Sequence, residues 1–316
     1  MVDVTCIGGL VADVVGTPVD AMPPRGTLAL LDRIELHSGG CAANTGVGLA
    51  RLGLRSAIIG KVGTDGFGHY LRSALAAGGA DVTGIAQDPN APTSATMVMV
   101  HGDGERTFLH CLGANAELTL DDIDERSALD CRVLLMAGAF LVPRLDGRPI
   151  ASLLEKAQRA GVITCLDTAW DATGRWMDIL APCMPFIDYF VPSYHEAVKL
   201  LPGIEDPAAL AAMFREMGAG CVVIKHGEHG CWITDDSGTC TVVPPFEVNT
   251  VDALGAGDAW VSGFLAAMLN GLPLKECARF ANAVGACCVT SLGATTGIRS
   301  YQETMEFMTH TNEGAH

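Results

Sequence analysis

Four apolar runs alternate with helical patterns in the second half of the chain, and this alternation limits the possible folds more than any other feature. The expected strands are Val133–Met136, Val162–Leu166, Tyr189–Val191 and Cys221–Ile224, and the expected helices cover about 149–160, 194–201 and 206–217. Strands that are apolar along their whole length are buried on both faces. Strands that alternate with helices form a parallel sheet covered by helices on both sides. The pattern predicts an α/β fold with a doubly wound, mostly parallel central sheet.

The first half of the chain adds strands and helices to this sheet and contains one region that does not fit the alternation. Residues 10–37 are interrupted by prolines, and residues 96–100 and 107–111 flank a turn-like segment typical of a β-hairpin. We expect the segments at about 10–37 and 93–112 to form a small β-sheet lid over a cleft. The chain, 1–316, is then a single domain with these lid segments inserted. The other expected elements are strands at 2–8 and 56–62, helices at 42–52 and up to residue 77, a hairpin from 231–234 to 239–243, helices at 257–270 and 273–289, and a loose tail from Asn312.

Charge and cysteine content exclude several classes of protein. The net charge of −16 and the pI of about 4.8 argue against nucleic acid as the main partner, because phosphate backbones need a basic face. The twelve cysteines contain no C-x-x-C pair, which favours buried, reduced thiols over disulfides or zinc. The N-terminus has no basic leader, and no apolar run reaches the ~18 residues that span a bilayer. We therefore expect a cytoplasmic protein that does not bind membranes.

The segment Val251–Trp260 contains the strongest chemical signal. Gly255, Ala256 and Gly257 are small and precede an apolar helix, so their N–H groups can face an anion at the helix N-terminus. Asp258 lies beside them, as phosphoryl transfer requires. The helix dipole predicts that the Asp258 carboxylate is ionised at neutral pH. The alternative is a glycine-rich turn with Asp258 as an ordinary N-cap or first-turn acid.

Other polar stretches follow the apolar strands and are expected to meet at one edge of the sheet. They come after residues 7, 62, 166, 191 and 224, and ligands of parallel sheets bind at this edge. Arg106, on the first hairpin, is predicted to reach over the cleft to the substrate; the alternative is a solvated hairpin charge. Arg175 follows Asp167–Asp171 and is predicted to brace a phosphate, with a surface arginine as the equal alternative.

Familiar nucleotide motifs are absent, but two signatures resemble another family. The sequence has no G-x-x-x-x-G-K-[ST], H-R-D or D-F-G segment. The first signature is the run from Ser38 to Gly53 followed by Gly60–Gly68, and the second is Asp252-Ala-Leu-Gly-Ala-Gly-Asp258. With these, and with weaker matches that follow in the same order, the chain resembles the ribokinase-like (pfkB-type) carbohydrate kinases, closest to bacterial sugar kinases of undefined substrate. The weaker matches are Gly113–Asn115, Lys225–Gly230, Ala281–Ala283 and Gly293–Gly297.

The resemblance implies an ATP-dependent kinase that phosphorylates a hydroxyl of a sugar or sugar derivative, with ATP, Mg²⁺ and a monovalent cation such as K⁺ as cofactors. Asp258 would be the catalytic base and the amides of Gly255, Ala256 and Gly257 the anion hole. The implied sugar-binding residues are Asp13, Gly39, Gly40, Asn44 and Asn115. The implied ATP-binding residues are Lys225, Gly227, Gly230, Asn282 and Ser193. Glu196 would help to organise Mg²⁺, and Asp252 would bind the monovalent cation.

Three departures from the family pattern concern specificity and metal binding. Ser193 replaces the asparagine of the family's N-x-x-E segment, and Ala253 replaces a threonine in the cation loop. Cys41 stands where ribokinases often carry lysine, which argues against ribose as the substrate. Two alternative functions stay open, a nucleoside kinase of the same fold and a catalytically silent sugar-binding protein. We also expect a homodimer through the lid, because an exposed sheet edge favours pairing.

Overall fold

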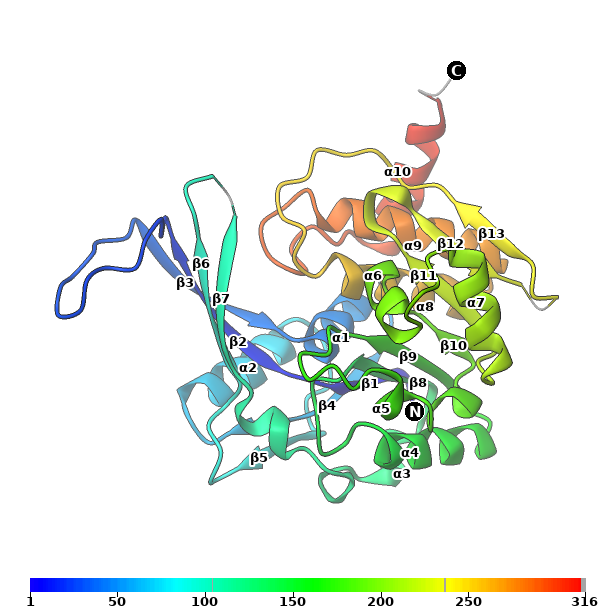
Figure 1. Cartoon of the computed structure of the whole chain (residues 1–316), viewed down its shortest axis with the longest axis horizontal. Coiled ribbons are helices and arrows are strands. Elements are labelled where there is room, and N and C mark those ends of the chain that lie inside the picture. Colours follow the sequence, from blue (N-terminus) through cyan, green and yellow to red (C-terminus); the bar gives the residue numbers. More distant parts are fainter. Residues whose placement is uncertain (104, 236, 314–316) are drawn as a thin grey trace.

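A large, mostly parallel sheet forms the body of the molecule (Figure 1). The computed structural model describes residues 1–103, 105–235 and 237–313. Within them the strand order of the central sheet is β13-β12-β11-β10-β9-β8-β1-β4-β5. Its strands are β1 (Val2–Gly8), β4 (Ser56–Gly63), β5 (Ile85–Asp88), β8 (Cys131–Ala139), β9 (Ile163–Thr168), β10 (Tyr189–Phe190), β11 (Cys221–Lys225), β12 (Cys231–Thr234) and β13 (Cys240–Val243). Neighbours from β11 to β5 pair in parallel, while β12 and β13 are antiparallel. The predicted sheet is confirmed.

Helices cover both faces of this sheet, and each face has its own hydrophobic core. Along β8, Val133 and Leu135 belong to one core, while Leu134 and Met136 belong to the other. Successive residues of a strand point to opposite faces, so a sheet with two cores needs apolar residues throughout. The helices are α1 (Cys41–Arg51), α2 (Gly66–Ala77), α3 (Glu125–Ala128), α4 (Arg148–Arg159), α5 (Met177–Leu180), α6 (Tyr194–Leu200), α7 (Pro207–Glu216), α8 (Ala256–Leu269), α9 (Leu274–Cys288) and α10 (Tyr301–Glu313). Short 3₁₀ helices occupy Gly113–Glu117, Leu120–Asp122, Met184–Phe186 and Gly227–His229.

Helix α8 is buried almost all round from Asp258 onward, while its first turn, with Ala256 and Gly257, reaches the surface of the cavity. The run from Asp258 to Ala267 is buried, and α8 packs between α1 and α9. A helix that is apolar on every side must have protein around it rather than solvent on one face. The Gly255–Asp258 segment is therefore attached to a helix that packs between two others.

The lid is a separate four-stranded sheet that projects from the body beside α1 and α2 (Figure 1). Its order is β3-β2-β6-β7, with β2 (Val11–Thr17), β3 (Arg33–Gly39), β6 (Ala95–Val100) and β7 (Arg106–Cys111). The predicted lid is confirmed as a small sheet, although β3 continues beyond the expected boundary at residue 37. Residues 104 and 236, which fall in the two expected hairpin turns, lie outside the described residues.

The sequence pattern does not predict helix α10. Its buried positions include Thr304 and Met308, so the apolar stripe is interrupted by a hydroxyl residue. The expected tail from Asn312 begins inside this helix, and residues 314–316 lie outside the described part of the chain. None of the helices in the described ranges is long and apolar enough to cross a membrane.

Candidate active site

The loop before α8 is shaped by close contact with a second loop. Gly255 caps the N-terminus of α8 with a φ of 73°, in the left-handed region that favours glycine. A Cβ at this position would lie 2.4 Å from the Cβ of Ala294. Glycine is therefore the residue that fits this helix start. The Ala256 N–H donates to the Ala253 carbonyl at 3.3 Å, and we expect the N–H groups of Gly257 and Asp258 to face an anion.

Asp258 lies at this helix start and is almost completely buried, with 9% of its surface exposed. Its Oδ2 accepts a hydrogen bond of 2.8 Å from Nδ2 of Asn44, on α1. Burial raises the pKa of Asp258, while hydrogen bonds from Asn44 and from the Cys41 thiol and the charge of Lys225 oppose this rise. Removal from water thus outweighs the hydrogen bonds and the charge of Lys225, and ionisation of Asp258 at neutral pH stays a prediction. A raised pKa suits a general base, which works best with a pKa near the operating pH.

One ammonium group lies among several carboxylates beside the loop. Lys225 ends β11, and its Nζ lies 2.6 Å from Oδ1 of Asp167, which is at the end of β9. Burial raises the pKa of Asp167 to about 7, against the attraction of Lys225. Glu196 and Asp258 also raise the pKa of Lys225, so the ammonium stays protonated. A Cβ at Gly257 would lie 3.6 Å from Nζ of Lys225, so the charge is next to the predicted anion hole.

Glu196 is fixed by a capping box at the start of α6. The Ser193 N–H donates to Oε2 of Glu196 at 2.9 Å, and the Ser193 hydroxyl accepts from the Glu196 N–H. Thr168 Oγ1 donates to the same carboxylate oxygen at 2.8 Å. Ser193 therefore serves as the N-cap of α6 and sets the direction of the glutamate.

These carboxylates fit a hydrated divalent cation. Asp167, Glu196 and Asp258 outnumber the single ammonium of Lys225, so the cluster favours added positive charge. Among the described residues no three metal-binding side chains come close enough to hold a metal directly. Mg²⁺ keeps several waters and binds through one or two carboxylates and substrate phosphates, which this set allows.

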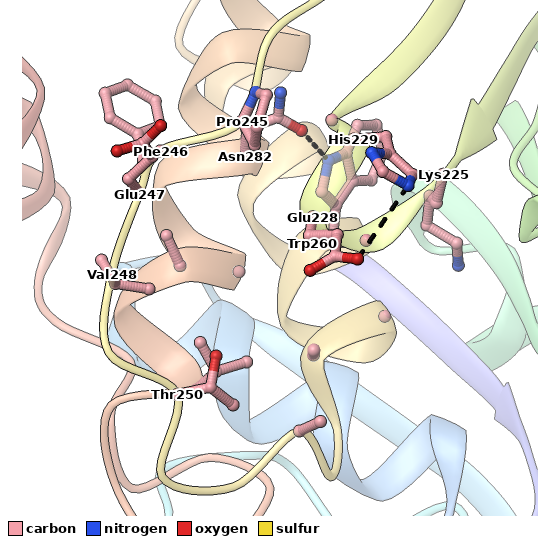
Figure 2. A pocket seen from close by; sticks show the side chains of 18 of the residues that line it. Lys225, Glu228, His229, Pro245, Phe246, Glu247, Val248, Thr250, Trp260 and Asn282 are labelled. Carbon is pink, nitrogen blue, oxygen red and sulfur yellow. Dashed lines mark hydrogen bonds and ion pairs between the residues drawn. The ribbon is translucent and has the colours of Figure 1, made fainter.

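A cavity of about 920 Å³ opens from Lys225 and Gly257 toward the surface (Figure 2). The turn containing Gly227 and Gly230 and the loop 245–250 form opposite walls, and α8 and α9 form the floor. This size is in the range of small-molecule sites. The cavity leads from the solvent to the anion hole, so a triphosphate nucleotide could lie along it with its phosphates inside.

Asn282, on α9, lines this cavity, but its amide bonds to protein on all sides. Its Oδ1 accepts from the Trp260 indole at 2.7 Å, and its Nδ2 donates to the carbonyls of Val243 and Pro244 at 3.1 and 2.8 Å (Figure 2). These bonds hold a tryptophan and the start of the 245–250 loop in place. Asn282 thus shapes the predicted adenine pocket by positioning its walls.

The predicted sugar residues gather on the other side of Asp258. Asp13, on β2, is buried at the root of the lid, and a Cβ at Gly39 would lie 2.0 Å from its Oδ2. Gly40 is the N-cap of α1, the helix that carries Asn44. Asn115 is buried and bonds the Leu10 backbone twice, with Oδ1 accepting from its N–H and Nδ2 donating to its carbonyl, both at 3.0 Å. This pair fixes the chain just before the lid.

The two arginines have different positions. Arg106 reaches across from β7 to Asp252, with 2.8 Å between Nη2 and Oδ1. The observed partner of Arg106 is therefore the protein itself, and its predicted contact with the substrate stays a prediction. Arg175 is exposed and donates to Thr173 of its own loop at 3.1 Å, so it does not join the lining of the cavity.

Several residues of the site carry no motif signal of their own. Asp167 could be found because it is a carboxylate at the end of a buried strand, and Cys41 lies within the first signature, where it replaces a residue of the family pattern. His37 lies on β3, and a Cβ at Gly293 would come within 3.9 Å of its Nδ1. Trp260, in the cavity floor, has the pattern of an ordinary core residue.

A phosphate-sized anion hole, a buried carboxylate base and an adjoining cavity define a phosphotransferase on an α/β scaffold. The family comparison agrees with this class. The sequence profile described as "pfkB family carbohydrate kinase" matches residues 1–300. The chain belongs to the pfkB family and is an ATP-dependent carbohydrate kinase, as the two signatures predict.

Individual relatives cover most or nearly all of the chain. A ribokinase of Haemophilus influenzae is 30% identical, and the match covers 97% of this chain and 98% of the ribokinase. Fructokinase-2 of Zea mays is 28% identical, with 87% and 86% covered. A solved structure of Arabidopsis thaliana ribokinase complexed with ribose and ATP superposes with a TM-score of 0.83 at 23% identity, covering 97% of this chain and 98% of that one.

Proposed function

We propose that this kinase transfers the γ-phosphoryl group of ATP to a sugar hydroxyl held between Asp258 and the lid. Asp258 accepts the hydroxyl proton, and the amides of residues 255–257 stabilise charge on the transferred group. Lys225 adds a fixed positive charge beside them. Bound Mg²⁺ supplies charge neutralisation on the phosphates, with Glu196 and Asp167 as the residues that would hold its waters. The carrying observation is the buried Asp258 directly after Gly257, which lines a cavity of nucleotide size.

A coupled ADP-release assay tests this function. Sugars, sugar acids and nucleosides are offered with ATP and Mg²⁺, and product is identified by mass spectrometry. We expect ADP release only in the presence of a hydroxylated acceptor. ATP hydrolysis that no acceptor stimulates would contradict the proposal. Faster turnover of nucleosides than of sugars would identify the protein as a nucleoside kinase.

The raised pKa of Asp258 predicts the pH dependence of the reaction. The base works only when deprotonated, so kcat/KM should fall as the pH falls through this pKa, which lies above the ordinary value of 3.8. Asn44→Ala removes a hydrogen bond that lowers this pKa, so the acidic limb of its profile should move to higher pH. The check is a pH profile of kcat/KM for both proteins. An identical limb, or a limb at lower pH in the variant, would contradict this assignment.

We propose activation by K⁺ through Asp252. The carboxylate and loop carbonyls are suitable donors, but Oδ1 already accepts from the Leu254 N–H and from Arg106, and Oδ2 from the Gly293 N–H at 2.9 Å. We therefore expect higher turnover in K⁺ than in Na⁺ or no added salt. Arg106→Gln should increase the dependence on K⁺, because it removes the guanidinium partner of Asp252. Equal turnover in K⁺ and in a bulky organic cation would remove this proposal.

We propose a homodimer formed by the outer faces of two lids. Ile34, Met97 and Leu109 lie on the lid face opposite Asp13, with 66%, 56% and 51% of their surfaces exposed. Apolar patches of this kind mark contact sites. Light scattering should give a dimer at micromolar concentration, and Leu109→Glu should give a monomer. Val242→Glu is the matched control, because Val242 is equally exposed, at 51%, but lies on the distant strand β13. A wild-type monomer would contradict the proposal.

We also propose that the protein works in a reducing compartment such as the cytoplasm. All twelve cysteines are free, and most are buried in the two cores. Burial raises the pKa of Cys231 and of Cys288 to about 12, which keeps these thiols protonated and unreactive.

A further inference from the structure

Small and apolar residues line much of the cavity that leads to the anion hole. Its floor includes Ala256, Gly257 and Gly285, and a Cβ at Gly285 would lie 3.8 Å from Cδ1 of Trp260. Val248 lines the cavity from the loop after β13 (Figure 2). Residues without a side chain let a ligand approach the backbone closely. A flat purine ring can therefore lie along this floor and be held by contact with carbon atoms.

The buried N–H groups of the cavity already donate to the protein. Asn282 and Trp260 are 5% and 6% exposed. The Asn282 amide donates to the carbonyls of Val243 and Pro244, and the Trp260 indole donates to the Asn282 amide oxygen. An amide nitrogen has two hydrogens and an indole has one, so all three are used. Neither side chain can donate to the edge of a base without breaking one of these bonds.

The polar side chains of the outer cavity walls are exposed to solvent. They are Glu228, His229, Glu247, Asn249 and Thr250. Glu228 and His229 lie 4.0 Å apart (Figure 2), and within the described residues no hydrogen bond holds the side chains of the other three. An exposed group exchanges a hydrogen bond to water for one to the ligand and has to be ordered, so its net contribution to binding is small.

Discrimination between purines needs buried polar groups that are fixed by the protein. Adenine donates from its 6-amino group, whereas guanine accepts at its 6-oxo group. A site that reads a hydrogen-bonding group with buried partners rejects the wrong ligand by about 10⁴–10⁵-fold, while an apolar pocket separates ligands of similar shape only weakly. The cavity beside Gly257 has the second character, because its buried donors are occupied and its other polar groups are exposed.

We propose that the phosphoryl donor can be any purine nucleoside triphosphate, with a 6-amino or a 6-oxo group, and that Asn282 supports the cavity wall without reading the base. The inference rests on the proposed function, because it concerns the donor side of the same reaction. It adds GTP-dependent and ITP-dependent phosphorylation to the activity with ATP. Donor affinity then comes from the triphosphate, which is identical in the three nucleotides.

Calorimetry with ADP and with GDP, each with Mg²⁺, measures recognition of the base without the chemical step. We expect the two dissociation constants to agree within about tenfold, the difference that one net hydrogen bond would cause. A larger difference in either direction would overturn the inference and leave the kinase function intact. Failure of both nucleotides to bind would also overturn it.

Turnover with ATP, GTP and ITP is then compared, with the sugar phosphate quantified by mass spectrometry. We expect kcat/KM values within about tenfold of one another. A larger preference for ATP would overturn the inference. Similar binding of ADP and GDP without phosphorylation of any acceptor would support the inference and contradict the proposed function.

Asn282→Ala separates support of the wall from recognition of the base. We expect the KM values for ATP and GTP to rise by the same factor, about tenfold, because the wall loses its hydrogen bonds. Trp260→Phe is a milder second variant that removes only the indole donor, and it should also raise both KM values equally. A changed ratio of the two KM values in either folded variant would overturn the assignment, as would wild-type values in both.

Asn270→Ala is the matched control. Asn270 also donates from Nδ2 to a backbone carbonyl, that of Ala266 at 2.8 Å, but it lies at the far end of α8. Both KM values should stay at the wild-type level in this variant. Losses equal to those of Asn282→Ala would show that the effect is not specific to the cavity wall and would overturn the assignment.

Discussion

Asp258→Asn should lower turnover by about 10²–10⁴-fold, the usual loss when a general base is removed. Asparagine has the size of aspartate, and its side-chain oxygen can still accept the hydrogen bond that Asn44 donates at 2.8 Å. Burial already disfavours the charged form of Asp258, so the neutral amide should change the free energy of unfolding by about 1 kcal/mol or less. ATP binding should persist, because the anion hole consists of main-chain amides.

Three measurements together decide this prediction. Steady-state turnover gives the loss, urea unfolding gives the stability, and calorimetry gives the affinity for ATP. A stable variant that phosphorylates its preferred sugar within about tenfold of the wild type would contradict the role of Asp258. Loss of ATP binding together with turnover would assign the residue to nucleotide binding instead.

Gly255→Ala should lower turnover by about 10²-fold, because a shift of about 1 Å in a catalytic loop has this effect. The new methyl would come within 2.4 Å of the Cβ of Ala294 and 2.7 Å of its carbonyl oxygen. The residue also has to keep a left-handed φ of 73°, which costs a side-chain-bearing residue about 1–2 kcal/mol. The loop must therefore move away from the transferred phosphoryl group.

Gly271→Ala is the control that distinguishes the effect of the steric clash with Ala294 from the effect of the left-handed backbone. Gly271 follows the other end of α8 and has a φ of 80°, but a Cβ there would have no atom within 4 Å. Both variants should lose similar stability from the backbone, and only Gly255→Ala should lose turnover. Equal activities of the two variants would show that the packing against Ala294 does not matter for catalysis.

Local sequence patterns predicted the fold because its two cores act on every residue of the strands. The alternation of Val133 and Leu134 between cores leaves no polar position in β8 after Arg132, and this is visible without a structure. The same holds for Gly255, whose spacing from Asp258 is a local property of the helix start. Features of the site that depend on residues close together in the sequence can therefore be predicted from the sequence alone.

Contacts between residues that are far apart in the sequence could not be predicted from such local patterns. The bonds of Asn282 to Trp260 and to the loop after β13 depend on how α9 packs, so its role as a wall support could not be inferred. The raised pKa of Asp258 could not be inferred from the sequence, because the helix dipole is local whereas burial depends on packing against distant elements such as α1. The stretch after β4 was expected to line the cleft, yet Asp65 caps α2 and bonds the Thr93 N–H at 2.8 Å.

The ion pair between Arg106 and Asp252 joins the lid to the loop that leads into Asp258, so we expect the position of the lid and the geometry of this loop to be coupled. A sugar that holds the lid down favours the same arrangement of Asp252 that an ordered Gly255–Asp258 loop requires. Binding free energies that share a conformational state are reciprocal. The factor by which bound sugar raises the affinity for ATP must equal the factor by which bound ATP raises the affinity for the sugar. Arg106→Gln should reduce both factors equally.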